Sequence, residues 1–213
     1  HGCRGCTQTD IVSENGAFSM TENKKLPLEG VKVVEMATVV AAPTTARVLC
    51  AYGAEVIKVE TLDGDVMRVA GTHEFTPYED DCNPLFTIHN KKFNSLNFKN
   101  EEGKKILMDL IADADVFITN VREKSLARNG LDYESLKAVN PGLVYGHFKG
   151  YGDKGPSAND PGFDISAFWL RSGPLADWST EGSFPFLPTY AFGDMVTSSA
   201  FLAGIMMALY ARK

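Results

Sequence analysis

Residues 31–60, VKVVEMATVVAAPTTARVLCAYGAEVIKVE, decide the fold. The runs 31–36 and Glu55–Glu60 are short, rich in valine and typical of buried strands. Between them, Pro43 suits the first turn of a helix and Gly53 suits its end. A strand, a helix and a second strand in this order predict parallel strands joined by a right-handed crossover.

The same alternation continues along the chain. The predicted elements are a short strand at 95–98, a helix capped by Asn100, a strand at Val116–Thr119, a helix at Tyr133–Val139, a strand at 143–148 and a loop at 150–162. We therefore expect an α/β fold: a Rossmann-like, open and mostly parallel sheet covered by helices.

Composition excludes several function classes. The chain is 44% hydrophobic and 23% charged, which is ordinary for a globular protein, and its net charge of -6 argues against nucleic-acid binding. The longest uncharged run, 195–211, contains polar residues and falls short of the ~18 apolar residues of a membrane span. We expect a buried helix there and no membrane partner.

The N-terminal cysteines Cys3 and Cys6 form a Cys-x-x-Cys pair, but no second pair or spaced histidine pair follows. We therefore expect no metal site. Residues 1–19 are interpreted as an added leader, with Met20 as the natural start, and residues 20–213 as the folded domain. The lack of a disulfide framework or secretory signal predicts a cytoplasmic protein.

Common nucleotide-binding motifs do not occur after the first strand. The segment 37–43, ATVVAAP, stands where a dinucleotide-binding domain has Gly-x-Gly-x-x-Gly, and the phosphate-binding loop Gly-x-x-x-x-Gly-Lys-Ser/Thr is also missing. Neither a nicotinamide dehydrogenase nor a P-loop enzyme is supported. The residues alone predict a ligand site at the carboxyl ends of the strands.

Several segments, taken in order, resemble the family III CoA-transferases. They are LEGVKVVE at 28–35, AP at 42–43, GAEVIKVE at 53–60, NKK at 90–92, GLDY at 130–133, NP at 140–141, GYG at 150–152, PGFD at 161–164 and GD at 193–194. The resemblance implies the N-terminal large domain of that fold, ending before the family's second domain. It also implies acyl-CoA and small carboxylic acids as substrates, coenzyme A as co-substrate, and a homodimer when full length.

The resemblance assigns the nucleophile to Asp194, which would carry the acyl group as a mixed anhydride and then CoA as a thioester. Asp194 follows Gly193 and opens an apolar helix, whose positive end favours an ionised carboxylate. A helix cap is the alternative role for this residue. Asp164 matches an auxiliary acidic position of the family, with a turn residue as an equal alternative.

The resemblance also implies a path for CoA. The positions matched to phosphate, adenosine or pantetheine contacts are Val39, Lys91, Leu96, Lys99, Asn120, Val121, Ser125 and Arg128. Surface charge and core packing are the ordinary alternatives for these residue types. Thr61 departs from the pattern, because some members have arginine there.

The acyl pocket is predicted from Thr38, Val40 and Phe163. Apolar groups solvate a second carboxylate poorly, so we expect an apolar or aromatic 2-hydroxy or unsaturated mono-acid. Racemases with this fold have histidine before the acid at 164, and Phe163 cannot accept a proton. An isomerase of that type and a non-catalytic CoA-binding or dimerisation fragment remain as alternatives.

Overall fold

The structure is a computed structural model that describes residues 25–68, 90–98, 100–184 and 189–212. Its five strands are β1 (Lys32–Met36), β2 (Glu55–Glu60), β3 (Lys92–Ser95), β4 (Val116–Thr119) and β5 (Val144–His147). They form one sheet in the order β3-β2-β1-β4-β5, and every neighbouring pair is parallel. The predicted α/β class with a parallel sheet is confirmed.

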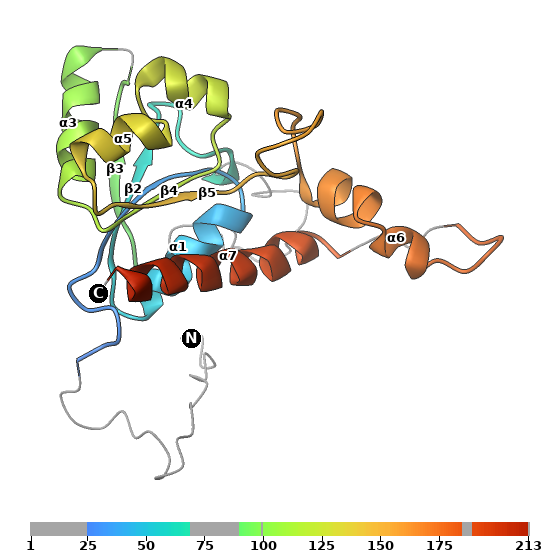
Figure 1. The fold of residues 1–213 in the computed structure, drawn as a ribbon. Helices are drawn as coiled ribbons and strands as arrows, with labels where there is room; N and C mark the ends of the chain where they lie inside the picture. The colour runs from blue at the N-terminus through green and yellow to red at the C-terminus, as the bar shows by residue number, and fades with distance from the viewer. Residues whose placement is uncertain (1–24, 69–89, 99, 185–188, 213) are drawn as a thin grey trace, which may run out of the picture.

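Helices cover both faces of this sheet (Figure 1). The helical elements of the described residues are α1 (Ala41–Ala51), α3 (Glu101–Ala112), α4 (Glu123–Asn129), α5 (Tyr133–Val139), α6 (Pro174–Asp177) and α7 (Phe192–Ala211), with a 3-10 turn η1 (Val66–Arg68) and a π-helical segment η2 (Asp164–Arg171). Helices α3, α4 and α5 lie on one face, and α1 and α7 lie on the other.

Adjacent residues of β1 explain why both faces are covered. Val33 packs into the core formed with α1 and α7, whereas Val34 packs into the core formed with α3, α4 and α5. Both side chains are almost fully buried, as in a parallel sheet between two helical layers. Burial of one such side chain contributes about 1.5–3 kcal/mol.

The predicted boundaries hold best where the apolar pattern is strong. The strand Val116–Thr119 and the helix Tyr133–Val139 are confirmed, and Asn100 caps α3 by accepting a hydrogen bond from the Gly103 amide at 2.7 Å. The strand predicted at 95–98 is wrong, because β3 spans Lys92–Ser95. That strand lies at the sheet edge with mostly exposed side chains, so it has no buried apolar pattern to reveal it.

Helix α7 is less buried than the sequence predicts. By length and composition it is apolar enough to cross a membrane, but most of its residues are not buried in this structure. Ile205 and Leu209 pack into the core beside α1, while Met207 and Tyr210 are exposed. The prediction of a buried helix is therefore wrong for most of this surface.

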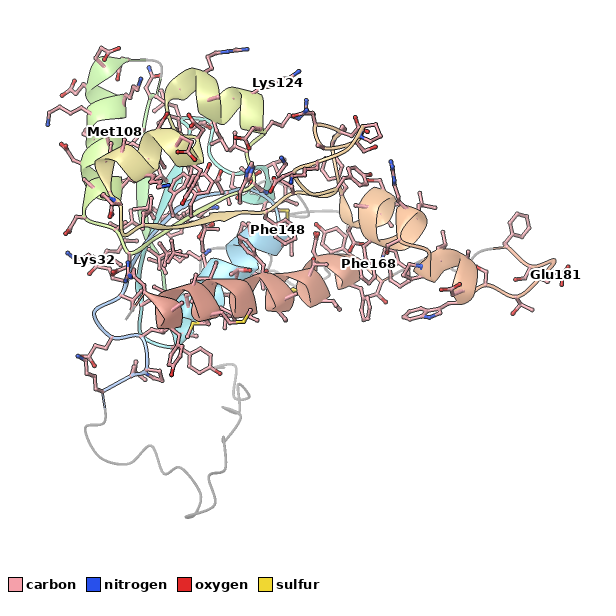
Figure 2. The ribbon with its side chains drawn as sticks, viewed as in Figure 1. Lys32, Met108, Lys124, Phe148, Phe168 and Glu181 are labelled. Atoms are coloured by element: carbon pink, nitrogen blue, oxygen red, sulfur yellow. The ribbon has the colours of Figure 1, made fainter. Side chains whose placement is uncertain are left out.

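Aromatic side chains attach the π-helical segment η2 to the start of α7. Phe168 and Trp169 from η2 pack against Phe192 of α7, with ring centroids 6.2 and 5.6 Å apart respectively. Figure 2 shows Phe168 beside this end of α7, and Phe148 above the middle of the helix, where its ring meets Phe201 edge-on. These contacts place η2 next to the first turn of α7.

Candidate active site

The sheet has a topological switch point between β1 and β4. From β1 the chain builds β2 and β3 on one side, and it then returns to build β4 and β5 on the other. The loops that follow β1 and β4 diverge there, which is where open parallel sheets bind ligands. A cleft of about 220 Å³ opens at this place, and it is lined by both loops, by the segment after β5 and by Asp194.

Asn120 joins the two loops at the switch point. Its side-chain oxygen accepts a hydrogen bond from the Thr38 amide at 3.0 Å, and its side-chain nitrogen donates to the Thr38 carbonyl at 2.8 Å. Both polar atoms of the Asn120 side chain therefore bond to the backbone of the β1–α1 loop. Asn120 therefore lines the cleft mainly as a residue that holds the β1–α1 loop in place.

Asp194 lies in the first turn of α7 and is half-buried. The helix is held across α1, where the Thr45 hydroxyl donates to the Ser198 carbonyl at 3.0 Å. This packing brings the start of α7 to the carboxyl edge of the sheet, and Asp194 lines the cleft there. Among the described residues, no lysine or arginine forms an ion pair with its carboxylate.

Asp164 supports the same turn from the start of η2. The Asp194 backbone N–H donates to Oδ1 of Asp164 at 2.9 Å. Gly193 makes this approach possible, because a Cβ at that position would lie 2.6 Å from the same oxygen and would overlap the ring of Phe168. The two predicted catalytic acids are thus brought together, with Asp164 bonded to the backbone beside the nucleophile candidate.

The environment raises the pKa of Asp194 to about 6, against an ordinary value of 3.8. Burial is the larger cause, and the negative charge of Asp164 adds to it. The expectation that the ionised form is favoured is therefore wrong in its net direction, because burial and the charge of Asp164 both raise the pKa of Asp194. A carboxylate with this pKa is still mostly ionised at neutral pH.

The cleft gathers many of the predicted site residues. Those that line it are Thr38, Val39, Val40, Asn120, Val121, Phe163 and Asp194. A second cavity of about 180 Å³ shares Thr38 and Val121 with it and also contains Ser125. Arg128 is exposed on α4, and Leu96 packs with the core around α3, so neither lines these two cavities. Lys99 lies outside the described residues.

Lys91 does not occupy the position expected of a phosphate ligand. Its ammonium group is fully buried, donating to Oε2 of Glu35 at 2.6 Å and to the Pro43 carbonyl at 2.9 Å. Burial lowers the pKa of Lys91, and the charge of Glu35 only partly offsets this effect. The predicted CoA contact of Lys91 is thus contradicted, because a phosphate cannot reach the enclosed group.

The sequence interpretation missed three basic side chains that line the cleft: Arg122, His147 and Lys149. His147 contacts the Val121 carbonyl through Nε2 at 2.8 Å and Glu123 through Nδ1 at 3.2 Å. Lys149 pairs with Asp153 at 3.0 Å. His147 ends β5, and Arg122 and Lys149 follow β4 and β5 within three residues. These positions could have identified them from the sequence, since ligands bind at the carboxyl ends of the strands.

Comparison with known proteins shows the family of the chain. Residues 28–213 match the model of CoA-transferase family III. The chain is 43% identical over 185 residues to the (R)-2-hydroxy-4-methylpentanoate CoA-transferase of Clostridioides difficile, covering 86% of this chain and 46% of that relative. It is 41% identical over 194 residues to the cinnamoyl-CoA:phenyllactate CoA-transferase of Clostridium sporogenes, covering 90% and 47% respectively.

A solved structure, that of a CAIB/BAIF family protein from Brucella suis, superposes with a TM-score of 0.80 at 36% identity. The superposition covers 89% of this chain and 50% of the Brucella protein. The chain therefore spans about half the length of the relatives it matches. Because the family model matches residues 28–213, which is most of the chain, the chain belongs to CoA-transferase family III.

Proposed function

We propose that this protein transfers CoA from an acyl-CoA to a carboxylic acid, with Asp194 as the nucleophile. The observation that carries the proposal is the half-buried carboxylate of Asp194 in a cleft at the switch point of the sheet. Its pKa of about 6 leaves it mostly ionised at neutral pH, while its partial burial removes some of the water that would weaken its attack.

The proposed reaction proceeds by two exchanges on the same side chain. A carboxylate oxygen of Asp194 attacks the thioester carbonyl, the C–S bond breaks, and a mixed anhydride and the CoA thiolate result. The thiolate then attacks Cγ of Asp194, the anhydride C–O bond breaks, and the donor acid leaves as its carboxylate. The acceptor carboxylate repeats these steps in reverse order. Protons and electrons balance without a further reactant.

Two features of the cleft suit an acyl-CoA: positively charged side chains that line it and a second cavity beside it. Arg122 and Lys149 offer positive charge to phosphate groups at the strand ends. The second cavity, which shares Thr38 and Val121 with the cleft, lies beside it between the ends of β1 and β2 and helix α4. A ligand longer than either cavity could follow this path.

For the acyl group we propose an apolar or aromatic 2-hydroxy or unsaturated mono-acid. Val39, Val40 and Phe163 line the cleft that also contains Asp194, and the side chain of Phe163 is 64% exposed. Covering such apolar surface favours an apolar acyl group. The two relatives above, named for 2-hydroxy-4-methylpentanoate and for cinnamoyl and phenyllactate, support this class of acid. Phe163 opposes racemase chemistry, because it cannot carry a proton.

The proposal is tested with the complete protein and its Asp194→Asn variant. Cinnamoyl-CoA and phenyllactate serve as probes, and formation of the new thioester is followed by chromatography. The variant should lose at least about 1,000-fold in turnover, because it lacks the nucleophilic oxygen. Asp177→Asn, on the exposed end of α6, is the matched control and should retain turnover. Retention of a tenth of the activity by Asp194→Asn would remove Asp194 from the mechanism.

A further inference from the structure

A chain of four buried charges lies against residues 37–43, part of which line the cleft. Lys91 bonds to Glu35 at 2.6 Å, Glu35 accepts from Lys58 at 2.9 Å, and Lys58 forms an ion pair with Asp65 at 3.0 Å. Their side chains are at most 1% exposed, and they come from β1, β2 and the segments next to β2 and β3. We call these four residues the buried charge chain.

The buried charge chain holds three points of residues 37–43, which form the loop after β1 and the first turn of α1. Lys58 donates to the Ala37 carbonyl at 2.6 Å, and Lys91 donates to the Pro43 carbonyl at 2.9 Å. Between these points, Oδ1 of Asp65 accepts a hydrogen bond from the Val39 amide at 3.3 Å. The start of the loop, its residue Val39 and the first turn of α1 are therefore all bonded to the same set of buried side chains.

Val39 has an unusual backbone conformation at the apex of this loop. Its φ of 68° lies in the left-handed region, which a β-branched residue rarely adopts. Such a conformation persists when its surroundings determine it, and it is found most often at functional sites. The hydrogen bond to Asp65 is a specific interaction that fixes the Val39 amide in this orientation.

Asp65 is also linked to the start of α7, because it bonds to Met67 and the Met67 side chain packs there. Oδ1 of Asp65 accepts a second hydrogen bond, from the Met67 amide at 3.0 Å. Met67 packs in a small apolar cluster with Val40 and Ala191, and Val39 and Met195 pack against that cluster. Ala191 caps the start of α7 before Asp194, and Met195 follows Asp194 directly in the helix.

We infer that Asp65 is a positioning residue that holds the left-handed turn at Val39 and, through the apolar cluster around Met67, sets the position of Asp194 in the cleft. The role differs from general stabilisation. Buried ion pairs often add little net stability compared with apolar residues of similar size, because removing both charges from water is costly. A role in fixing the conformation of this loop explains why the buried charge chain has charged rather than apolar side chains. Its consequence for catalysis rests on the proposed function, but the backbone role does not.

The test uses Asp65→Asn and Asp65→Ala in the complete protein. Asparagine keeps the size of the side chain and one acceptor but loses the charge that pairs with Lys58, whereas alanine removes both. Asn140→Ala is the control, because it removes hydrogen bonds to three carbonyls, of residues 111, 112 and 114, away from the cleft. Hydrogen–deuterium exchange of the peptide covering 37–43 reports the loop, and crystal structures report the φ angle of Val39.

Asp65→Ala should speed exchange in peptide 37–43 at least 10-fold and move Val39 out of the left-handed region, and Asp65→Asn should lie between it and wild type. With cinnamoyl-CoA as the probe, kcat should fall at least 10-fold while KM changes less than 3-fold. Asn140→Ala should alter neither the loop nor kcat. Should Asp65→Ala not fold, the volume-conserving Asp65→Asn carries the comparison.

Unchanged exchange and an unchanged Val39 angle in the Asp65 variants would overturn the inference, as would equal effects from Asn140→Ala. A wild-type protein without transfer activity would instead overturn the proposed function. The exchange and φ measurements would then still decide whether Asp65 holds the loop.

Discussion

The backbone N–H of Asp194 donates a hydrogen bond to Oδ1 of Asp164 at 2.9 Å, which joins the start of η2 to the start of α7. The carboxylate of Asp164 thereby fixes the turn that presents Asp194, and its charge also contributes to the raised pKa of Asp194. One side chain thus both positions the proposed nucleophile and limits its ionisation. The consequences can be measured as changes in stability and activity.

Asp194→Asn should stabilise the fold at pH 7.5. The folded-state pKa of about 6 exceeds the ordinary 3.8, so the unfolded state loses this proton first as the pH rises. Stability is therefore retained below about pH 4 and lost between about pH 4 and 6. After allowance for partial exposure and for the helix dipole, we expect the variant to gain about 1 kcal/mol at pH 7.5.

Urea denaturation at pH 7.5 and pH 4 measures this difference. Most of the gain should disappear at pH 4, where the carboxyl group of Asp194 is protonated in the folded state and about half protonated in the unfolded state. Asp177→Asn should show no comparable gain at either pH, since Asp177 is exposed on α6. A loss of stability in Asp194→Asn at pH 7.5 would contradict the burial and repulsion described for this side chain.

Gly193→Ala should destabilise the protein by about 2–4 kcal/mol, because the added Cβ would overlap Phe168 and crowd Oδ1 of Asp164. Gly204→Ala is the matched control in the same helix, since its Cβ would meet nothing within 4 Å. The control should be neutral or gain up to about 1 kcal/mol from helix propensity. Equal effects of the two substitutions in thermal denaturation would argue against the tight approach of η2 to α7.

Asn120→Ala should weaken both the fold and the binding of free CoA. It removes the two hydrogen bonds to Thr38, so a stability loss of about 1–3 kcal/mol is expected. Titration calorimetry of the complete protein should show CoA affinity reduced at least 10-fold. Asn140→Ala should lower stability similarly but leave CoA affinity unchanged, and equal loss of affinity in both variants would refute a local role of Asn120.

Phe163→Ala should change the selectivity between acids more than the overall rate of transfer. The exposed ring of Phe163 lines the cleft, so its removal should lower kcat/KM for phenyllactate at least 10-fold relative to that for acetate. Phe184→Ala, at a ring that is 97% exposed outside the cleft, is the control and should preserve the ratio. An unchanged ratio in Phe163→Ala would remove this ring from the acyl pocket.

The sequence predicted the parts of the fold in which apolar residues repeat. β4 and α5 were predicted to the residue, because buried strands and amphipathic helices have distinct periods. The edge strand β3 and the short helix α4 lack a strong apolar pattern, so local sequence did not define them. The segment η2 was also missed, since its π-helical hydrogen bonds have no recognised residue period.

The candidate site was predictable where it depends on the strand ends and the Gly193–Asp194 pair. The contact between Asp164 and Asp194 depends on the packing of η2 against α7, which neither segment encodes alone. Lys91 was wrongly predicted to bind phosphate, because its ion-pair partner Glu35 lies in β1, far from Lys91 in the sequence. Glu35 and Lys58, charged residues within apolar strands, were the signal for a buried ion network.

The central claim is that Asp194 becomes covalently modified during transfer. The complete protein is incubated with cinnamoyl-CoA, trapped separately with hydroxylamine and with borohydride, digested and mapped by mass spectrometry. The account predicts a hydroxamate or a reduced side chain at Asp194, dependent on acyl-CoA and absent from Asp194→Asn. Modification at a different residue, or turnover without any modification of Asp194, would contradict it.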